Sequence, residues 1–529
     1  MEFSQEQENI FNYADKGVLN IIVHAVAGAG KTTTLVECAK RINTKKKVML
    51  LAHNRSTRDT LKERIGDMDN VYVFTLHGLA WRMYTEHFED RPVINDEKYR
   101  NYINKNIDAI ATEAYRGLSR TKKLMYKANV FDLIDKARYN LKQSEKEIKK
   151  LAEKKYGIEL IADEPHFVAR VLKWGTENRD EVDYQDLLWF PYQLGYFTKR
   201  YVADIIMLDE AQDASLAQQD IVKRCMKRET RLFAFGDENQ TINSWCGSDT
   251  NSFEHLEDAD EFRRGAIKMP LTTNYRCGKN IIEYAKRFVN NNIHAREGAQ
   301  DGLVRHDVSL SEAKDGDMIL CRNIAPLMTV YRRGVANGQR MYFRGEQLGK
   351  TLLREADCAE GETIDEIVRS MKRRLISVWA FITKDAGIDE RESVADPRIV
   401  ALLDTIKTME NLPKTVDTRK KLEKFAKDVF SDEGRDGIQL STIHRAKGLE
   451  ADNVFIVCPS LVPSKLATLP WQIQEEQNLQ YVMCTRPKNT LNFVTEKEVA
   501  PFKAFAESNS MYSELKKIRE EVESIEWPQ

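Results

Sequence analysis

Cysteine is scarce in this chain of 529 residues: it contributes 8, which are scattered and form no Cys-x-x-Cys pair. This argues against a disulfide framework or a zinc ribbon and favours a reducing compartment. No apolar run approaches the roughly 18 residues that a membrane span needs, and the polar N-terminal segment is unlike a secretory signal. Neither sign of charge dominates, because 81 Lys and Arg residues meet 82 Asp and Glu residues. Net charge therefore says nothing about a nucleic-acid partner, and only local charge is informative.

Hydrophobic residues make up 42% of the chain and charged residues 31%, which excludes a mostly disordered protein. Short apolar runs rich in β-branched residues alternate with helical stretches, a pattern typical of parallel strands joined by helices. The expected strands form two groups, 19–25, 48–53, 71–76, 205–209 and 232–236, then 318–321, 438–443, 454–458 and 491–494. The sequence thus predicts two α/β domains.

Two long stretches, 90–184 and 346–435, contain no convincing strand and are predicted to be helical insertions. Within the first, residues 116–155 carry 13 basic and 5 acidic residues. This charge fits a solvated helical face as well as a patch that faces phosphates.

Residues 25–32, Ala-Val-Ala-Gly-Ala-Gly-Lys-Thr, follow an apolar strand and precede a helix. Small residues in this context let backbone N–H groups approach phosphates at a helix N-terminus. Lys31 would then reach the β- and γ-phosphates, and Thr32 would bind Mg²⁺. The first glycine of the usual phosphate-loop pattern is Ala25 here.

A phosphate loop needs a distal acid, and the strand at 205–209 ends in Asp209-Glu210-Ala-Gln-Asp213. We expect Asp209 to hold Mg²⁺ and Glu210 to orient or deprotonate the attacking water. The alternative interpretation of these acids is a helix-capping cluster.

Further segments complete an ordered series over residues 3–491, namely 3–7, 25–32, 209–213, 236–245, 274–276, 442–450 and 481–486. In content and order they resemble the Q motif and motifs I to VI of the superfamily 1A DNA helicases of the UvrD/Rep type. The phosphate loop and residues 75–80 are also similar to the F-box DNA helicase branch, although no F-box is apparent. The resemblance implies two RecA-like P-loop NTPase domains with helical insertions, which hydrolyse ATP with Mg²⁺ between them.

The resemblance also implies a role for single residues. The implied catalytic residues are Lys31, Glu210, Gln240, Arg276 and Arg486, the last three acting on the γ-phosphate. The implied ATP contacts are Gln7, Ala25, Val26, Ala27, Gly28, Ala29, Gly30, Lys31, Thr32, Thr33, Tyr275 and Glu450. The implied metal ligands are Thr32 and Asp209, and the implied DNA contacts are Asn54, Arg55, Thr75, His77, Trp245, Thr442 and His444. Motif III departs from the family, because Asn243 and Cys246 stand where tyrosine and arginine are usual.

We therefore expect domain 1A at 1–89 and 185–267, helical 1B at 90–184, domain 2A at 268–345 and 436–529, and a short 2B at 346–435. The segment 183–188 is expected to be the strand or turn that re-enters domain 1A. The expected function is a DNA helicase that moves 3′→5′ on single-stranded DNA and unwinds duplex, as a monomer with no membrane partner. Its expected location is the cytoplasm, the nucleoid, or the host-cell cytoplasm for a virus-encoded protein.

Two other functions stay open. One is a DNA-stimulated ATPase that strips proteins from single strands without processive unwinding, which the short 2B and the altered motif III allow. The other is a P-loop scaffold without turnover, against which Glu210 argues.

Overall fold

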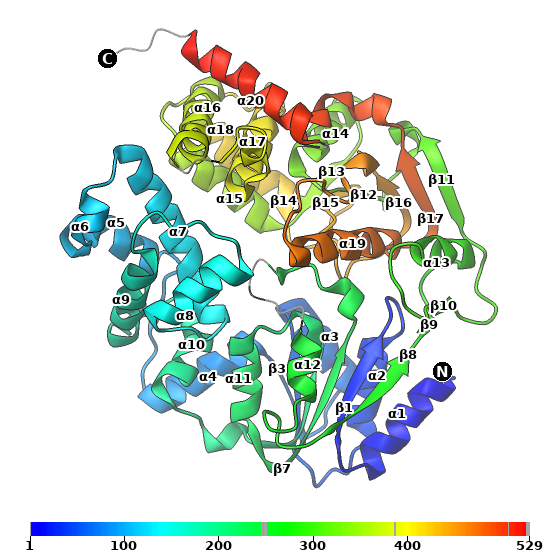
Figure 1. Ribbon diagram of the computed structural model, residues 1–529. Coiled ribbons are helices and arrows are strands. Elements are labelled where there is room, and N and C mark those ends of the chain that lie inside the picture. Colours follow the sequence, from blue (N-terminus) through cyan, green and yellow to red (C-terminus); the bar gives the residue numbers. More distant parts are fainter. Residues whose placement is uncertain (1, 245–246, 248–250, 386–387, 506, 525–529) are drawn as a thin grey trace. The chain divides into compact units, whose positions relative to one another are not determined.

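The computed structural model describes residues 2–244, 247, 251–385, 388–505 and 507–524. The chain divides into two compact units, Met1–Asn274 and Tyr275–Gln529 (Figure 1). Both are α/β, as the sequence predicts, and each contains its own large parallel sheet. Among the described residues, no helix combines the length and the apolar character that a membrane crossing requires.

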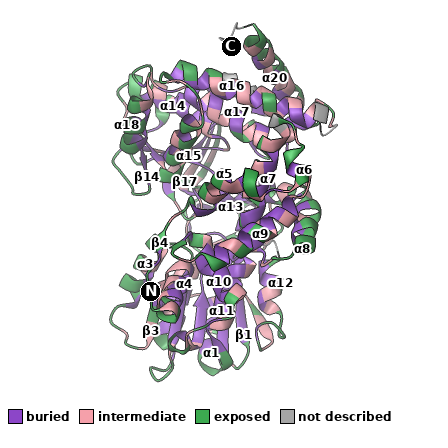
Figure 2. Cartoon of the chain, turned by 90° about the vertical axis from the view of Figure 1, so that its left-hand side faces the viewer, coloured by how far each residue is buried: buried purple, intermediate pink, exposed green. Residues whose placement is uncertain are grey.

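The first unit contains a six-stranded sheet whose neighbouring strands are all parallel. The order is β3-β2-β6-β7-β1-β8, with β1 Asn20–Ala25, β2 Val48–Ala52, β3 Val71–Thr75, β6 Ala203–Leu208, β7 Met226–Gly236 and β8 Ala266–Leu271. Every residue of β2 is buried, as the continuous apolar run predicts for a strand covered on both faces. Figure 2 shows strands of this sheet, around β1, in the purple of buried residues. The sequence placed a domain boundary after residue 267, whereas β8 belongs to this sheet and the unit ends at Asn274.

Seven helices precede, connect or flank the strands of the first sheet. They are α1 Gln5–Lys16, α2 Lys31–Arg41, α3 Arg55–Ile65, α4 Leu76–Phe88, α10 Tyr184–Leu194, α11 Leu216–Arg224 and α12 Ser252–Glu257. Asn54 and Thr75 cap α3 and α4, because their side-chain oxygens accept from the backbone N–H groups of Thr57 and Gly78. The parallel strands therefore end, and the helices begin, at one edge of the sheet.

The stretch 90–184 is mainly helical, with α5 Lys98–Ile110, α6 Glu113–Arg116, α7 Arg120–Tyr139, α8 Glu145–Lys150 and α9 Glu164–Glu177. A π-helical turn, Leu151–Lys155, continues α8. Two short strands, β4 Val93–Ile94 and β5 Glu181–Val182, pair in parallel where the chain enters and leaves the insertion. The helices enclose a core of their own, with Tyr126, Leu133 and Phe167 fully or nearly fully buried.

The second unit contains a seven-stranded sheet, again parallel throughout. The order is β11-β17-β16-β12-β15-β13-β14, with β11 Leu303–Val308, β12 Met318–Cys321, β13 Met341–Arg344, β14 Phe430–Ser431, β15 Ile438–Thr442, β16 Ala451–Ile456 and β17 Pro487–Val494. The four strands predicted for this half of the chain lie next to one another, in the order β17-β16-β12-β15.

The helices around the second sheet are α13 Lys279–Ala285, α14 Ile324–Ala336, α19 Pro470–Cys484 and α20 Ser508–Glu523. The stretch 346–435 contributes α15 Glu346–Asp357, α16 Ile364–Ala380, α17 Pro397–Glu410 and α18 Arg419–Val429. The C-terminal helix α20 packs on α16, where Lys372 forms an ion pair with Glu521 at 2.9 Å. Residues of the helical stretch are thus held by the very end of the chain.

Candidate functional site

The segment between β1 and α2 folds as the sequence predicts for a phosphate-binding loop. Gly28 (φ 66°) and Gly30 (φ 76°) both adopt the left-handed backbone conformation that favours glycine. The buried side chain of Asn274 donates a 2.6 Å hydrogen bond to the Ala27 carbonyl and so holds the loop from the end of the unit. Helix α2 begins at Lys31, and no side chain caps its N-terminus. The backbone N–H groups there are therefore available to bind a phosphate.

Asp209 and Glu210 follow β6 at the edge where β1 ends, and this brings them to the loop. The Lys31 Nζ atom lies 3.7 Å from Glu210 Oε1, and the Glu210 N–H donates to Asp209 Oδ1 at 3.0 Å. Burial and the neighbouring Glu210 carboxylate raise the pKa of Asp209 to about 7, which Lys31 opposes. Glu210 precedes a short 3₁₀ turn, Ala211–Asp213, but makes no side-chain cap to it. The geometry favours the catalytic interpretation over the capping one.

These groups fit a magnesium ion. A buried carboxylate beside a second carboxylate is stabilised by a bound cation, and oxygen ligands are the ones Mg²⁺ prefers. Among the described residues, no cluster of three or more His, Cys, Asp or Glu could hold a metal ion by itself. Mg²⁺ bound with phosphates usually takes only one or two ligands from the protein, which is the number that Asp209 and Thr32 would supply.

Gln212 is a further residue of this site, and the sequence analysis did not assign it a role. Its Nε2 atom donates to Glu210 Oε2 at 2.6 Å, while its Oε1 atom accepts from the Asp237 N–H at 3.0 Å. Asp237 in turn accepts a 2.6 Å hydrogen bond from Gln240. Gln212 thereby connects the expected base to the segment that carries the expected γ-phosphate sensor. A Cβ at Gly236 would lie 2.2 Å from Gln212 Oε1, so the glycine makes room for this contact.

Gln7, the expected adenine contact, lies beside the phosphate loop but is already engaged. Its Oε1 atom accepts from the Ser4 N–H at 3.0 Å, and its Nε2 atom donates to Thr34 Oγ1 at 2.9 Å. Its contact with adenine stays a prediction.

Two of the nucleotide residues expected in the second unit, Arg276 and Glu450, form an ion pair. Glu450 accepts a 2.7 Å hydrogen bond from Arg276 Nε and forms a 3.1 Å ion pair with Lys488. Burial opposes the effect, but Arg276 and Lys488 hold the pKa of Glu450 below its ordinary value. Arg486 is 1% exposed, and its guanidinium donates to the carbonyls of residues 482 and 449. A contact of Arg486 with phosphate therefore requires that this side chain change its partners.

The residues of the first unit that are expected to contact DNA lie where the β-strands of its sheet end. The register that pairs Ala52 with Thr75 places the residues after β2 and β3 side by side. Asn54 and Arg55 are exposed there, whereas the Thr75 hydroxyl is buried and used as a helix cap. His77 is in the first turn of α4.

The segment 183–188, expected as a strand or turn, begins helix α10 instead. Asp183 is the N-cap, and its reciprocal hydrogen bonds with Asp186 form a capping box, which is a signature of a helix N-terminus. The first helical residue, Tyr184, is 41% exposed, and its ring lies edge-on to His77 with centroids 6.2 Å apart. Tyr184, an exposed aromatic ring beside His77, is therefore a further candidate for contact with a base. Its position directly after Asp183 is the sequence signal that points to it.

The remaining DNA contacts are less exposed or lie outside the described residues. Thr442 is buried at the end of β15. Burial, with the nearby cations of Arg322 and Arg445, lowers the pKa of His444 well below its ordinary value, so a contact of His444 with DNA would be that of a neutral ring. Trp245 and Cys246 of motif III lie outside the described residues.

A parallel sheet with a phosphate loop, a lysine at the start of the next helix and paired carboxylates after another strand of the same sheet defines a P-loop nucleoside triphosphatase. Residues 3–260 match the family model described as the UvrD/REP helicase N-terminal domain, and residues 358–498 match the UvrD-like helicase C-terminal domain. The chain belongs to the UvrD/Rep family of helicases.

Individual relatives are distant. DNA helicase II of Salmonella typhimurium is 21% identical over 89% of this chain and 82% of its own length. The F-box DNA helicase protein 1 of Schizosaccharomyces pombe is 23% identical over 89% of this chain and 55% of its own. ATP-dependent DNA helicase PcrA of Bacillus subtilis is 24% identical over 51% of this chain and 38% of its own. The chain thus matches only about half or less of the length of some of these relatives.

Proposed function

We propose that this protein is an ATP-dependent DNA helicase that moves 3′→5′ on single-stranded DNA and unwinds the duplex ahead. The observation that carries the proposal is that two sets of residues share one edge of the first sheet. Lys31, Asp209 and Glu210 follow β1 and β6, and the residues expected to contact DNA follow β2 and β3. A ligand bound to one set can therefore bias the other. The direction of movement rests on the resemblance to superfamily 1A.

In this mechanism the chain's own residues divide the chemistry. Lys31 contacts the transferred phosphate, and Glu210 orients the attacking water and accepts its proton. Gln212 and Lys31 hold the Glu210 carboxylate from two sides, at 2.6 and 3.7 Å. Arg276, and Arg486 after it leaves its internal partners, would reach the phosphates from the second unit. Magnesium, held by Asp209 and Thr32, would neutralise charge on the phosphate oxygens.

The alternative is an ATPase that strips proteins from single strands without processive unwinding, which the short helical stretch 346–435 and the altered motif III, with Asn243 and Cys246, leave open. We propose for either function that the protein acts on single-stranded DNA as a monomer.

The two functions are separated by measuring ATP hydrolysis with and without an oligothymidine, beside displacement of a labelled strand from a 3′-tailed duplex. Hydrolysis that the oligothymidine stimulates, together with displacement, supports the helicase. Stimulated hydrolysis without displacement supports the alternative. Absence of any hydrolysis would leave only nucleotide binding and would contradict both.

A further inference from the structure

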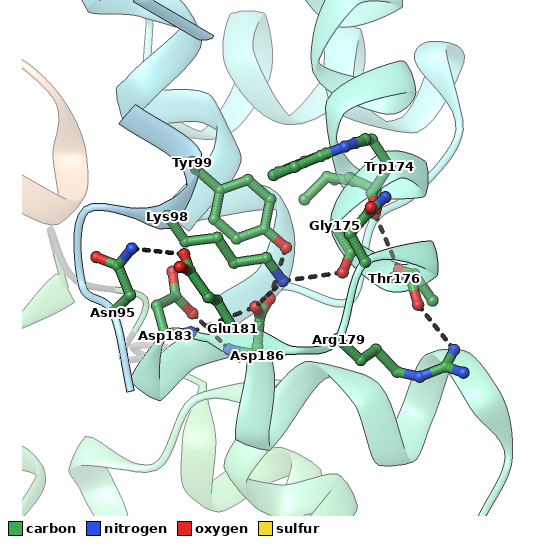
Figure 3. Close-up of polar contacts among 12 residues, drawn as sticks. Asn95, Lys98, Tyr99, Trp174, Gly175, Thr176, Arg179, Glu181, Asp183 and Asp186 are labelled. Atoms are coloured by element: carbon green, nitrogen blue, oxygen red, sulfur yellow. Dashed lines mark hydrogen bonds and ion pairs between the residues drawn. The ribbon is translucent and has the colours of Figure 1, made fainter. Parts of the chain in front are cut away.

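Four buried charged residues meet where the helical insertion joins α10, and Figure 3 shows three of them, Lys98, Asp183 and Asp186. Lys98, the first residue of α5, donates from Nζ to Asp186 Oδ2 at 2.7 Å and to the Gly175 carbonyl at 2.9 Å. Arg138, near the end of α7, donates to Asp183 Oδ1 at 2.7 Å and to Asp186 Oδ1 at 3.0 Å. Two cations from the insertion thus hold two carboxylates of α10.

The cluster leaves little freedom to its members. Lys98 is 3% exposed, Asp186 is 0% exposed and Arg138 is 2% exposed. The Tyr99 hydroxyl donates to Asp186 Oδ1 at 2.6 Å, and a Cβ at Gly175 would lie only 2.1 Å from that hydroxyl. Removing one partner from such a cluster leaves an uncompensated buried charge, which is strongly unfavourable. The carboxylates are therefore fixed in place.

What these carboxylates fix is the first turn of α10. Asp183 and Asp186 are its N-cap and N3 residues and form its capping box. Tyr184, between them in sequence, is the exposed ring beside His77. The orientation of Tyr184 is thus set by groups that reach α10 from the insertion.

Tyr139, the residue after Arg138, also contacts α10 and lies close to Gly247. The Tyr139 hydroxyl accepts from Gln185 Nε2 at 2.7 Å, again on the first turn of α10. Its Cβ also lies 2.3 Å from where a Cβ at Gly247 would be, and Gly247 (φ 90°) follows motif III. The end of α7 therefore contacts both α10 and the segment after motif III.

We propose that Lys98 and Arg138 are positioning residues for single-strand binding: through Asp183 and Asp186 they hold Tyr184 in the orientation in which it stacks on a base. In this proposal the helical insertion supports the residues of the first unit that contact single-stranded DNA. This inference rests on the proposed function, because it requires that Tyr184 contact DNA.

The test is a double-mutant cycle on affinity for a fluorescent oligothymidine, at fixed salt and well below the melting temperature of each variant. Tyr184→Ala should weaken binding about tenfold, within the range for one base stack. Lys98→Met should weaken binding about fivefold in the wild-type background but less than about twofold in the Tyr184→Ala background. A purely structural role would not make the effect of Lys98 depend on Tyr184.

Two further variants complete the design. Asp183→Asn keeps a capping oxygen but weakens the bond to Arg138, so it should fold and lose about twofold to threefold in affinity, again only when Tyr184 is present. Lys136→Met is the matched control on α7, because Lys136 pairs with Asp132 and not with α10; it should bind as the wild type does. Hydrolysis of ATP without DNA should be unchanged in Lys136→Met.

Equal losses from Lys98→Met or Asp183→Asn in both backgrounds would overturn the proposal, as would wild-type affinity in either variant. Wild-type affinity of Tyr184→Ala would also overturn it, because Tyr184 would not contact the strand. The proposed helicase function would survive that result, since it depends on the unwinding of duplex by the unmodified protein.

Discussion

At the scale of single residues, the chemistry depends on groups held in unusual states. Glu210 has a left-handed backbone (φ 50°), which costs a residue with a Cβ roughly 1–2 kcal/mol. Asp209, beside it, is buried with its pKa raised to about 7. Strain and desolvation of this kind are typical of functional sites. Both residues lie where the sequence predicts the acids of a phosphate-transfer reaction.

For Glu210→Gln we expect loss of ATP turnover by about a hundredfold or more, with ATP and DNA binding retained. The amide keeps the shape and can still accept a hydrogen bond, but it cannot take a proton from water. Steady-state hydrolysis and equilibrium binding of a fluorescent ATP analogue check this. If nucleotide affinity fell together with the rate, the carboxylate would have a structural or metal-binding role.

For Gln212→Leu we expect kcat to fall about tenfold with little change in KM for ATP, because the leucine removes both hydrogen bonds that align Glu210 with Asp237. Gly236→Ala approaches the same contact from the other side and should reproduce the loss, since its Cβ would displace the Gln212 amide. Lys223→Met, a surface change at the end of α11, serves as the control. Unchanged kcat in the leucine variant would remove Gln212 from the site.

The pKa of His77 leads to a pH dependence of stability. Burial lowers this pKa to about 4, with His53 adding to the effect and Asp183 opposing it, from an ordinary value of 6.5. As pH falls below 6.5 the unfolded chain takes up the proton first, so stability present above that pH is lost toward pH 4, by roughly 2 kcal/mol at pH 5. His77→Gln should therefore flatten the fall in melting temperature between pH 7.5 and 5. An equal fall in both proteins would contradict the assignment.

At the scale of elements, a residue of the helical stretch 346–435 caps the N-terminus of α14, a helix that packs around the second sheet. The side chain of Asp404 on α17 accepts from the backbone N–H groups of Ile324 at 3.1 Å and Ala325 at 3.0 Å, the first residues of α14. The N-cap residue Asn323 makes no capping hydrogen bond from its own side chain. A residue from the insertion thus does the work of a local cap.

Asp404→Ala should lower the free energy of unfolding of the second unit by about 1–2 kcal/mol, the usual cost of a lost N-cap. Asp417→Ala is the matched control, because Asp417 is exposed and its carboxylate forms an ion pair with Lys421, four residues further on. Thermal unfolding of the two variants beside the wild type decides the matter. Equal melting temperatures for the two variants would show that the contact to α14 carries no stability.

Whether a strand can be predicted from the sequence depends on how far it is buried. Strands covered on both faces, such as β2 and β12, appear as continuous apolar runs and are confirmed. The strands β8 and β11 are partly exposed at sheet edges, so their sequences alternate or contain charge and were missed. The prediction of a strand or turn at 183–188 is wrong, because Asp183 and Asp186 form a capping box that begins α10.

The candidate site shows the same division. Lys31, Asp209 and Glu210 could be predicted because local spacing after a strand fixes where they lie. Gln212, Lys98 and Arg138 act through partners that are distant in sequence, or through contacts only the folded chain shows. Spacing likewise could not show that Arg486 is buried with backbone carbonyls as its partners.

At the scale of the whole molecule, each unit supplies one half of the expected chemistry. The first holds the phosphate loop, the carboxylates and the exposed edge with Asn54, Arg55 and Tyr184. The second holds Arg276 and Glu450 as an ion pair at 2.7 Å. Arginine supplied to a transferred phosphate is worth about 10³–10⁵ in rate in related phosphoryl transfers. In the proposed mechanism, hydrolysis of ATP therefore uses residues of both units.

The most direct test of this account is unwinding of three matched duplexes, with a 3′ tail, with a 5′ tail and with blunt ends, in the presence of ATP and Mg²⁺. The account predicts that the wild type separates the 3′-tailed duplex and leaves the other two paired. It also predicts that Lys31→Ala separates none, because the cation on the transferred phosphate is missing. Separation by Lys31→Ala, or separation of the 5′-tailed duplex in preference to the 3′-tailed one, would contradict the account.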